Sequence, residues 1–253
     1  MNRAWSRNEL LIAMNLYCKL PFGQCNSRNK LVNEVSKNLK RSPGAISMKL
    51  GNLASLDPYQ RNRGVVGLKS VSNLDRQIWQ QFQDDWARMA ERSEEAFNIL
   101  MNSAPLHEDE EEFKYPEGAS QVDRFVKTRR LQNFFRNAVL SSYNHRCALS
   151  GITIDRLLNA SHIIPWSKSE SRRADPTNGI CLNVLYDRAF DRGLITFDED
   201  YRLVLSSDLK AGNVPDLQRD NFINKEGDTL WLPHRFLPDH NALEYHRNNL
   251  FVA

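Results

Sequence analysis

The chain has 253 residues, of which 41% are hydrophobic and 26% charged, with 11 Gly and 10 Pro. This length allows one large domain or two ordinary ones, and the composition excludes collagen-like, low-complexity and wholly disordered proteins. No apolar run reaches the ~18 residues of a membrane-spanning helix, and the first residues lack the apolar core of a signal peptide. The four cysteines include no pair at two-residue spacing, so we expect a cytoplasmic protein with reduced thiols and no membrane partner.

The net charge of +3 is the sum of large opposing blocks. Residues 1–71 carry 12 Lys and Arg against 3 Asp and Glu, a net charge of +9. Residues 72–118 carry 4 against 12, a net charge of −8, and residues 119–253 carry 18 against 16, a net charge of +2. Basic blocks are candidate polyanion-binding surfaces, and acidic blocks are usually solvated linkers. We therefore expect three segments with these boundaries.

Three helices are predicted within the first 57 residues. Apolar residues recur at helical spacing behind a possible Ser6 cap, and a second such stripe covers residues 31–39. Ser42 and Pro43 have the order of an N-cap and a first helical residue, so a third helix is expected to begin there. The short turn between the second and third helices is what a helix-turn-helix module requires.

The opening at residues 5–10 and the stretch at residues 39–46 resemble Myb-like DNA-binding modules. Separately, Lys40, Arg41 and Lys49 surround the start and the polar face of the third helix. Helix N-termini and basic side chains both contact phosphates, so these residues are candidate nucleic-acid ligands. The alternative is a three-helix module that binds protein and carries a solvated basic face.

The next segment is expected to begin with a loop over residues 59–71. A long helix follows from about Asn73 and runs close to Met101. It is either a spacer or dimer-forming element, or a helix packed on its own N-terminal domain. The acidic run at residues 108–112, followed by Pro116 and Gly118, predicts a domain boundary.

From residue 119 the pattern changes to an amphipathic helix, whose polar face includes Arg129 and Arg130. We then expect strands at residues 148–150 and 157–164, a loop at 167–178, a helix at 183–191 and a hairpin at 194–206. The order of strand, loop, strand and helix predicts a ββα unit. Together with the mainly helical N-terminal domain, this predicts an α+β fold.

Polar side chains with complementary chemistry fall within this unit. His162 ends a predicted strand, Asn178 follows the loop, and Asp187 and Asp191 are four residues apart on the predicted helix. That spacing puts both carboxylates on one helix face, where oxygen ligands suit a hard divalent ion such as Mg²⁺. A nearby histidine can accept a proton from water near neutral pH. Together these groups match the needs of phosphodiester hydrolysis.

Four stretches of sequence carry a family resemblance: residues 146–151, 160–166, 178–183 and 187–195. They resemble the HNH endonucleases, most closely the branch found in restriction and other bacterial defence nucleases. The resemblance implies a ββα-metal (His-Me finger) nuclease domain at residues 119–253. It also implies a divalent cofactor, Mg²⁺ or Mn²⁺, and double-stranded DNA as the partner.

The resemblance assigns roles by position. His162 corresponds to the general base, and Asn178 to the asparagine that ties the loop of the ββα unit together. Asp187 and Asp191 fall at the metal-binding end of the helix. Ser161 stands where many members have an Asp or His ligand, and Tyr186 where this branch commonly has His. Which residues ligate the metal therefore stays open.

Arg172 and Arg173 in the loop are either phosphate contacts or ordinary loop charges. We expect a DNA endonuclease acting in restriction or anti-phage defence, and cutting of both strands by a single-site domain suggests a homodimer. One alternative is a catalytically degenerate HNH-fold protein that binds DNA or regulates, which agrees with Ser161 and Tyr186. Another makes residues 1–104 a protein-docking module.

Overall fold

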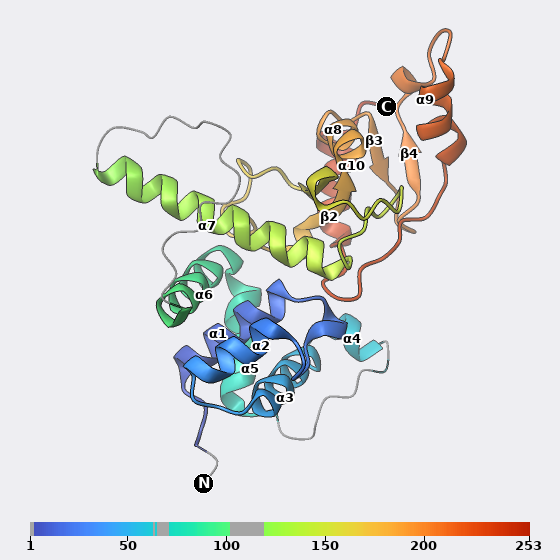
Figure 1. Cartoon of the computed structure of the whole chain (residues 1–253). Coiled ribbons are helices and arrows are strands. Elements are labelled where there is room, and N and C mark those ends of the chain that lie inside the picture. Colours follow the sequence, from blue (N-terminus) through green and yellow to red (C-terminus); the bar gives the residue numbers. More distant parts are fainter. Residues whose placement is uncertain (1–2, 63, 65–70, 102–118) are drawn as a thin grey trace. The chain divides into compact units, whose positions relative to one another are not determined.

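The fold is taken from a computed structural model, which describes residues 3–62, 64, 71–101 and 119–253. The acidic run at 108–112 and the boundary predicted there lie outside these residues. The chain forms two compact units (Figure 1). The first contains Met1–Ala138 with Ser171–Ala174, and the second contains Val139–Glu170 with Asp175–Ala253.

The first unit is helical (Figure 1). Its elements are α1 (Arg7–Lys19), the 3₁₀ turn η1 (Phe22–Gln24), α2 (Lys30–Asn38), α3 (Pro43–Ala54), α4 (Pro58–Asn62), α5 (Asn73–Asp84), α6 (Trp86–Met101) and the first part of α7 (Ala119–Ser142). The three predicted N-terminal helices are confirmed as α1, α2 and α3. The short α4 replaces the first part of the loop predicted at residues 59–71.

The starts of α1 and α3 follow the predicted capping chemistry. The Ser6 hydroxyl accepts from the Glu9 N–H, and the Glu9 carboxylate accepts from the Ser6 N–H at 2.8 Å, which makes a capping box. Ser42 accepts from the Ala45 N–H, and Pro43 occupies the first helical position. Each cap satisfies a backbone donor that the helix itself leaves unpaired.

Helix α1 is the centre of this unit and contacts α3, α5 and α6. Its residues from Leu10 to Cys18 are buried, because helices cover it on several sides. A polar contact joins α1 to α6, where Asn15 Nδ2 donates to Glu94 Oε1 at 3.0 Å. Of the two alternatives for residues 73–101, the structure therefore supports packing on the N-terminal domain.

The single long helix predicted from Asn73 to about Met101 is wrong. The helix breaks at Asp85, whose backbone is not helical (φ −155°, ψ 88°), and α6 starts at the next residue. The Asp85 carboxylate accepts from the Arg88 N–H at 3.0 Å and so caps α6. Phe82 before the break and Trp86 after it meet edge to face with ring centroids 5.2 Å apart.

The second unit combines helices with two small sheets (Figure 1). After the end of α7 come η2 (Asp155–Leu157), β1 (Leu158–His162), η3 (Pro176–Asn178), β2 (Gly179–Asn183), α8 (Val184–Asp191), β3 (Ile195–Phe197), β4 (Leu203–Leu205), η4 (Ser207–Leu209), α9 (Asp216–Asn221), η5 (Ile223–Lys225) and α10 (His240–Asn249). Strands β1 and β2 pair antiparallel, as do β3 and β4. The fold is thus α+β, as predicted.

The strand predicted at residues 148–150 is wrong, because these residues form a turn. Gly151 has a φ of +75°, and its N–H donates to the Cys147 carbonyl at 3.0 Å. The Cys147 thiol accepts from the Ser150 N–H at 3.4 Å and from the Asn183 N–H at 3.2 Å. Apolar composition alone did not reveal these hydrogen bonds, of which the one to Asn183 joins residues far apart in the sequence.

Candidate active site

The strands β1 and β2 and the helix α8 form a compact strand–strand–helix arrangement. His162 pairs with Gly179 at one end of the two strands, and Leu158 pairs with Asn183 at the other. Helix α8 contacts both strands. The Asn183 side chain caps this helix by accepting from the N–H groups of Leu185 and Tyr186, each at 3.0 Å. One residue therefore ends β2 and starts α8, which places the helix directly on the strands.

Asn178 closes the long loop between β1 and β2. Its side-chain oxygen accepts from the Ile164 N–H at 2.9 Å, and its side-chain nitrogen donates to the Ile164 carbonyl at 3.0 Å. Its backbone carbonyl also accepts from the Ile163 N–H at 2.9 Å. Because Asn178 is 1% exposed, these bonds are shielded from water. Asn178 is a positioning residue that holds the chain immediately after His162.

His162 lies at the end of β1 and is half-buried. Its ring meets the Trp166 ring edge to face, with centroids 5.7 Å apart. The two residues that follow it are bonded to Asn178, so the backbone immediately after the histidine is fixed. Such anchoring limits the orientations available to the imidazole.

Asp187 lies in the first turn of α8 and receives two hydrogen bonds from β1. Asn159 Nδ2 donates to Asp187 Oδ2 at 2.6 Å, and the Ser161 hydroxyl donates to Asp187 Oδ1. Residues two apart on a strand share a face, which explains why both donors reach the same carboxylate. The structure thus joins Ser161 to Asp187. Sequence reasoning missed Asn159, although its position two residues before Ser161 was a usable signal.

Asp191 is one helical turn beyond Asp187, at the last residue of α8. Partial burial and the negative charge of Asp187 raise the pKa of Asp191, while Arg188 and Arg192 act in the opposite direction. The two carboxylates therefore sense each other's charge, and a cation beside them would relieve that repulsion. Their predicted position on one helix face is confirmed.

These oxygens fit a hard divalent ion held by few protein ligands. A carboxylate offers about four lone-pair sites, so the two hydrogen bonds to Asp187 leave acceptor capacity for a cation. Mg²⁺ typically takes one or two carboxylates and keeps several waters. Across the described part of the chain, no group of three or more His, Cys, Asp or Glu side chains could hold a metal ion. A closed tetrahedral zinc site does not fit these residues.

The last turn of α8 is held by α10 and by the chain end. The His246 ring stacks on the Phe190 ring with centroids 3.8 Å apart, and His246 Nε2 lies 3.1 Å from the Phe190 carbonyl. Gly193, at a φ of +67°, follows the helix, and a Cβ there would lie 2.0 Å from the Leu250 carbonyl oxygen. His246 therefore packs on α8 through a contact between residues that are far apart in the sequence.

The arginines predicted to contact DNA lie in the first unit. Arg129 is exposed on α7, and Arg130 is half-buried there. Arg172 and Arg173 are half-buried in the segment that groups with the helices, where the Ser171 carbonyl accepts from the Ala87 N–H at 3.3 Å. None of the four belongs to the unit that contains His162.

Two of the three N-terminal candidates are used inside the first unit. Lys49 Nζ lies 2.8 Å from Asp75 Oδ1, and both side chains are buried. Arg41 binds the Glu9 carboxylate, with Nε 2.9 Å from Oε1 and Nη2 2.9 Å from Oε2. Lys40 is exposed in the turn between α2 and α3. The cationic groups of Lys49 and Arg41 therefore face carboxylates rather than solvent.

Comparisons with known proteins agree with this geometry. A search of the curated proteins found no match. Within the described residues, no helix is both long and apolar enough to span a membrane. Neither these comparisons nor the structure supports the predicted homodimer. Residues 147–198, which contain β1, β2, α8 and β3, match a family model described as HNH endonuclease.

Proposed function

We propose that this chain is a metal-dependent DNA endonuclease of the ββα-metal type that acts in restriction or anti-phage defence. The observation that carries the proposal is that the segment matched by the HNH family contains His162, Asn178 and Asp187 in strand–loop–strand–helix order. Phosphodiester hydrolysis needs a base for water and a positive charge beside the phosphate. This segment offers both a histidine and a pair of carboxylates.

In this mechanism, His162 accepts a proton from the attacking water as the water oxygen bonds to phosphorus. The bond from phosphorus to the 3′ oxygen breaks, and that oxygen takes up a proton from a solvent water. A divalent ion bound by Asp187, with Asp191 beside it, would supply positive charge at the phosphate. Ser161 and Asn159 orient the Asp187 carboxylate, and Asn178 holds the chain that carries His162.

The helical unit is proposed to engage the DNA duplex as a Myb-like module. Its exposed candidates are Lys40 and Arg129, with Arg130, Arg172 and Arg173 half-buried beside other groups. Residues 3–62 retain the α2–turn–α3 order that a helix-turn-helix uses. Basic contacts of this kind position a protein on DNA without reading its sequence.

Plasmid cleavage by the His162→Ala protein in Mg²⁺ or Mn²⁺ tests the assignment. We expect its cleavage rate to fall by about 10²- to 10⁴-fold, which is the usual contribution of a general base. The matched control is His240→Ala, which removes a histidine that packs beside Tyr201 with ring centroids 4.8 Å apart. Cutting at the wild-type rate by His162→Ala, or undiminished wild-type cutting in chelator, would contradict the proposal.

A catalytically degenerate HNH-fold protein that binds DNA is the second candidate. It is favoured by Ser161 at the usual ligand position and by the lack, among the described residues, of a three-member cluster of metal-ligating side chains. This candidate predicts duplex binding with a steep salt dependence but no cleavage stimulated by metal. The plasmid assay separates the two functions, because only the nuclease makes His162 necessary for an activity.

A further inference from the structure

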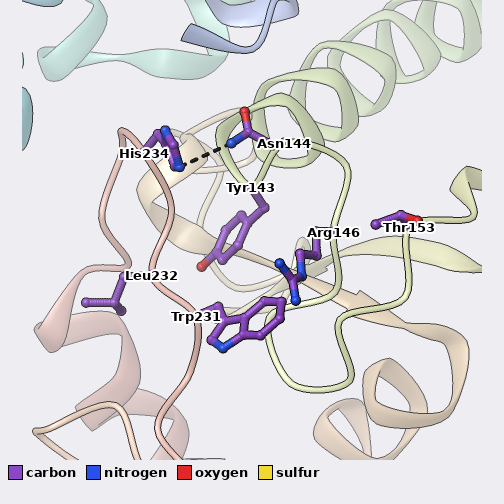
Figure 2. Close-up of a pocket in the computed structure, with 7 residues that line it drawn as sticks. All are labelled: Tyr143, Asn144, Arg146, Thr153, Trp231, Leu232 and His234. Atoms are coloured by element: carbon purple, nitrogen blue, oxygen red, sulfur yellow. Dashed lines mark hydrogen bonds between the residues drawn. The ribbon is translucent and has the colours of Figure 1, made fainter. Parts of the chain in front are cut away.

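A pocket of about 430 Å³ opens in the second unit, between the end of α7 and the segment that precedes α10 (Figure 2). Its wall includes Tyr143, Asn144, Arg146, Trp231, Leu232 and His234. The volume falls within the range of pockets that bind small molecules. None of these residues takes part in the site around His162, and the mechanism proposed above does not use the pocket.

Trp231 and Arg146 form the pocket's most distinctive feature. The guanidinium carbon of Arg146 lies 2.9 Å from the centroid of the Trp231 ring, and Figure 2 shows the two side chains next to each other. Trp231 is nevertheless 47% exposed, and Arg146 is exposed as well. An exposed indole is costly to maintain in water, whereas it offers a flat apolar surface to a ligand.

The backbone on both sides of the pocket is held in place. The Trp231 N–H donates to the Ala148 carbonyl at 2.9 Å, and the Ala148 N–H donates to the Cys181 carbonyl of β2 at 2.8 Å. Gly151 lets the pair approach, because a Cβ there would lie 3.2 Å from both Arg146 Nη2 and the Trp231 ring. The pocket is therefore tied to β2, one of the two strands of the proposed active site.

A buried arginine anchors the second wall. Arg235 is 0% exposed, and its Nη2 donates to the Ser141 hydroxyl at 2.7 Å. The neighbouring His234 N–H donates to the Ser142 carbonyl at 2.8 Å, and the His234 side chain meets Asn144 with Nε2 3.1 Å from Nδ2 (Figure 2). A preformed wall of this kind lowers the entropy lost when a ligand binds.

We propose that this pocket binds one unpaired nucleotide, with its base stacked on Trp231 and its phosphate bound by Arg146. A nucleobase matches the flat indole, and stacking on aromatic side chains accepts any base. The Arg146 guanidinium has five N–H donors in a planar fork, which suits a phosphate. A paired base in a duplex has both faces covered by its neighbours, so the occupant must be unpaired.

The nucleotide has two possible sources, a free mononucleotide or a single-stranded stretch of the DNA substrate. The second source rests on the proposed function, and the first does not. Binding measurements in chelator separate them without any cleavage. The probes are a fluorescein-labelled oligodeoxyadenosine single strand, the same strand fully paired in a duplex, and unlabelled dAMP as a competitor, all followed by fluorescence anisotropy.

Trp231→Ala is expected to weaken binding of the single strand by about 5- to 150-fold, the usual loss when a stacking aromatic is removed. Arg146→Gln should weaken it by about tenfold or more, since it removes a charge-assisted bond to phosphate. Trp231→Phe should keep part of the affinity, because it retains a flat ring. Arg202→Gln, which removes an exposed arginine outside the pocket, is the matched control and should bind like the wild type.

Affinity for the fully paired duplex should change less than about twofold in Trp231→Ala, since base faces there are covered. If dAMP displaces the single strand from the wild type but not from Trp231→Ala, the occupant of the pocket is a free mononucleotide. If dAMP does not compete and strand binding still depends on Trp231, the occupant is a single-stranded stretch of DNA. Urea unfolding checks that the Trp231→Ala and Arg146→Gln proteins are folded. If the folded variants bind the single strand and dAMP as the wild type does, the proposal is overturned. The His162→Ala protein should bind the single strand normally, so failure of the nuclease proposal leaves this result intact.

Discussion

Arg41 and Lys49 show how burial changes what a basic residue does. Trp5 lies next to both, with its ring centroid 4.1 Å from the Arg41 guanidinium carbon and 5.1 Å from Lys49 Nζ. Burial alone would raise the pKa of Glu9, but the hydrogen bonds from Arg41 and Ser6 hold it below its usual range. Trp5 therefore packs against the cations of two buried ion pairs, Arg41 with Glu9 and Lys49 with Asp75.

Replacing Lys49 by Met should destabilise the protein by about 3–5 kcal/mol, because Asp75 would keep a buried charge without its cation. Asp75 is 0% exposed, so water cannot replace the lost partner. Urea unfolding followed by circular dichroism measures the change. Lys37→Met, at an exposed lysine of α2, is the matched control and should change stability by less than about 0.5 kcal/mol.

Asp75→Asn combined with Lys49→Met should recover part of the lost stability, because the double variant no longer buries the negative charge of the Asp75 carboxylate. Equal stability of Lys49→Met and the wild type would show that the ion pair contributes nothing. DNA affinity of the folded Lys49→Met protein should match that of the wild type, since this ammonium group faces Asp75 rather than solvent.

At the scale of elements, α8 depends on contacts at both of its ends. Asn183 caps its first turn, and a Schellman motif closes its last turn, with the Leu194 N–H donating to the Ala189 carbonyl at 2.9 Å. Gly193 supplies the left-handed residue that this motif needs. Helix α10 completes the enclosure through His246, so the carboxylates of α8 stand on a rigid support.

The pH dependence of stability should reveal the buried His246. Burial lowers its pKa to about 4, and the positive charge of Arg247 acts in the same direction. An unfolded histidine takes up a proton below about pH 6.5, whereas the folded one does so only near pH 4. The unfolded state thus binds more protons in this window. The contribution of His246 to the free energy of unfolding is fully present above pH 6.5 and should fall by about 3 kcal/mol as the pH drops to 4.

The free energy of unfolding of the wild type and of His246→Gln, measured in urea from pH 7 to pH 4, tests this expectation. The variant should start lower, because it loses the ring stack on Phe190, and its stability should depend less on pH. Acid effects from other groups, including Glu9, occur in both proteins and cancel in the difference. Parallel pH curves for the two proteins would assign the acid sensitivity elsewhere.

For the whole molecule, the partition of charge remains informative after burial is taken into account. The +9 of residues 1–71 includes buried ion pairs at Lys49 and Arg41, so less of that charge faces solvent than the sequence implied. Lys40 keeps its charge exposed and adopts a left-handed backbone, with a φ of 54°. It therefore remains the clearest DNA-contact candidate among the three N-terminal ones.

The salt dependence of duplex binding tests that role. If Lys40 contacts a phosphate, Lys40→Gln should lower the slope of log K against log[salt] by about one and weaken binding of all sequences alike. Arg219→Gln, at an exposed arginine of α9 in the second unit, should leave the slope unchanged. The slopes come from fluorescence anisotropy at several salt concentrations in chelator. An unchanged slope for Lys40→Gln would favour the protein-docking alternative for this module.

Much of the fold followed from local patterns. Ser6 and Ser42 predicted the starts of α1 and α3, and the spacing of Asp187 and Asp191 predicted that both lie on one face of α8. The clasp by Asn178 agrees with the role that the family resemblance implied. Such features are predictable because they depend on residues only a few positions apart, or on a family pattern.

The features that sequence reasoning missed depend on long-range contacts. The break at Asp85 lets two helices pack on α1, and the bond from Asn159 to Asp187 crosses from strand to helix. The stack of Trp231 with Arg146 joins residues far apart in the chain. No periodicity encodes such pairs, because each partner alone fits an ordinary surface position.

By itself, the sequence determined the secondary-structure elements around the candidate site, the residue types that phosphodiester hydrolysis requires, and the HNH resemblance. The tertiary structure decided which charges are available. It placed Lys49 and Arg41 in buried ion pairs, joined Ser161 to Asp187, and left Trp231 exposed above a pocket. The physical reason is that spacing along the chain sets local geometry, whereas burial and partner choice arise only when distant segments pack together.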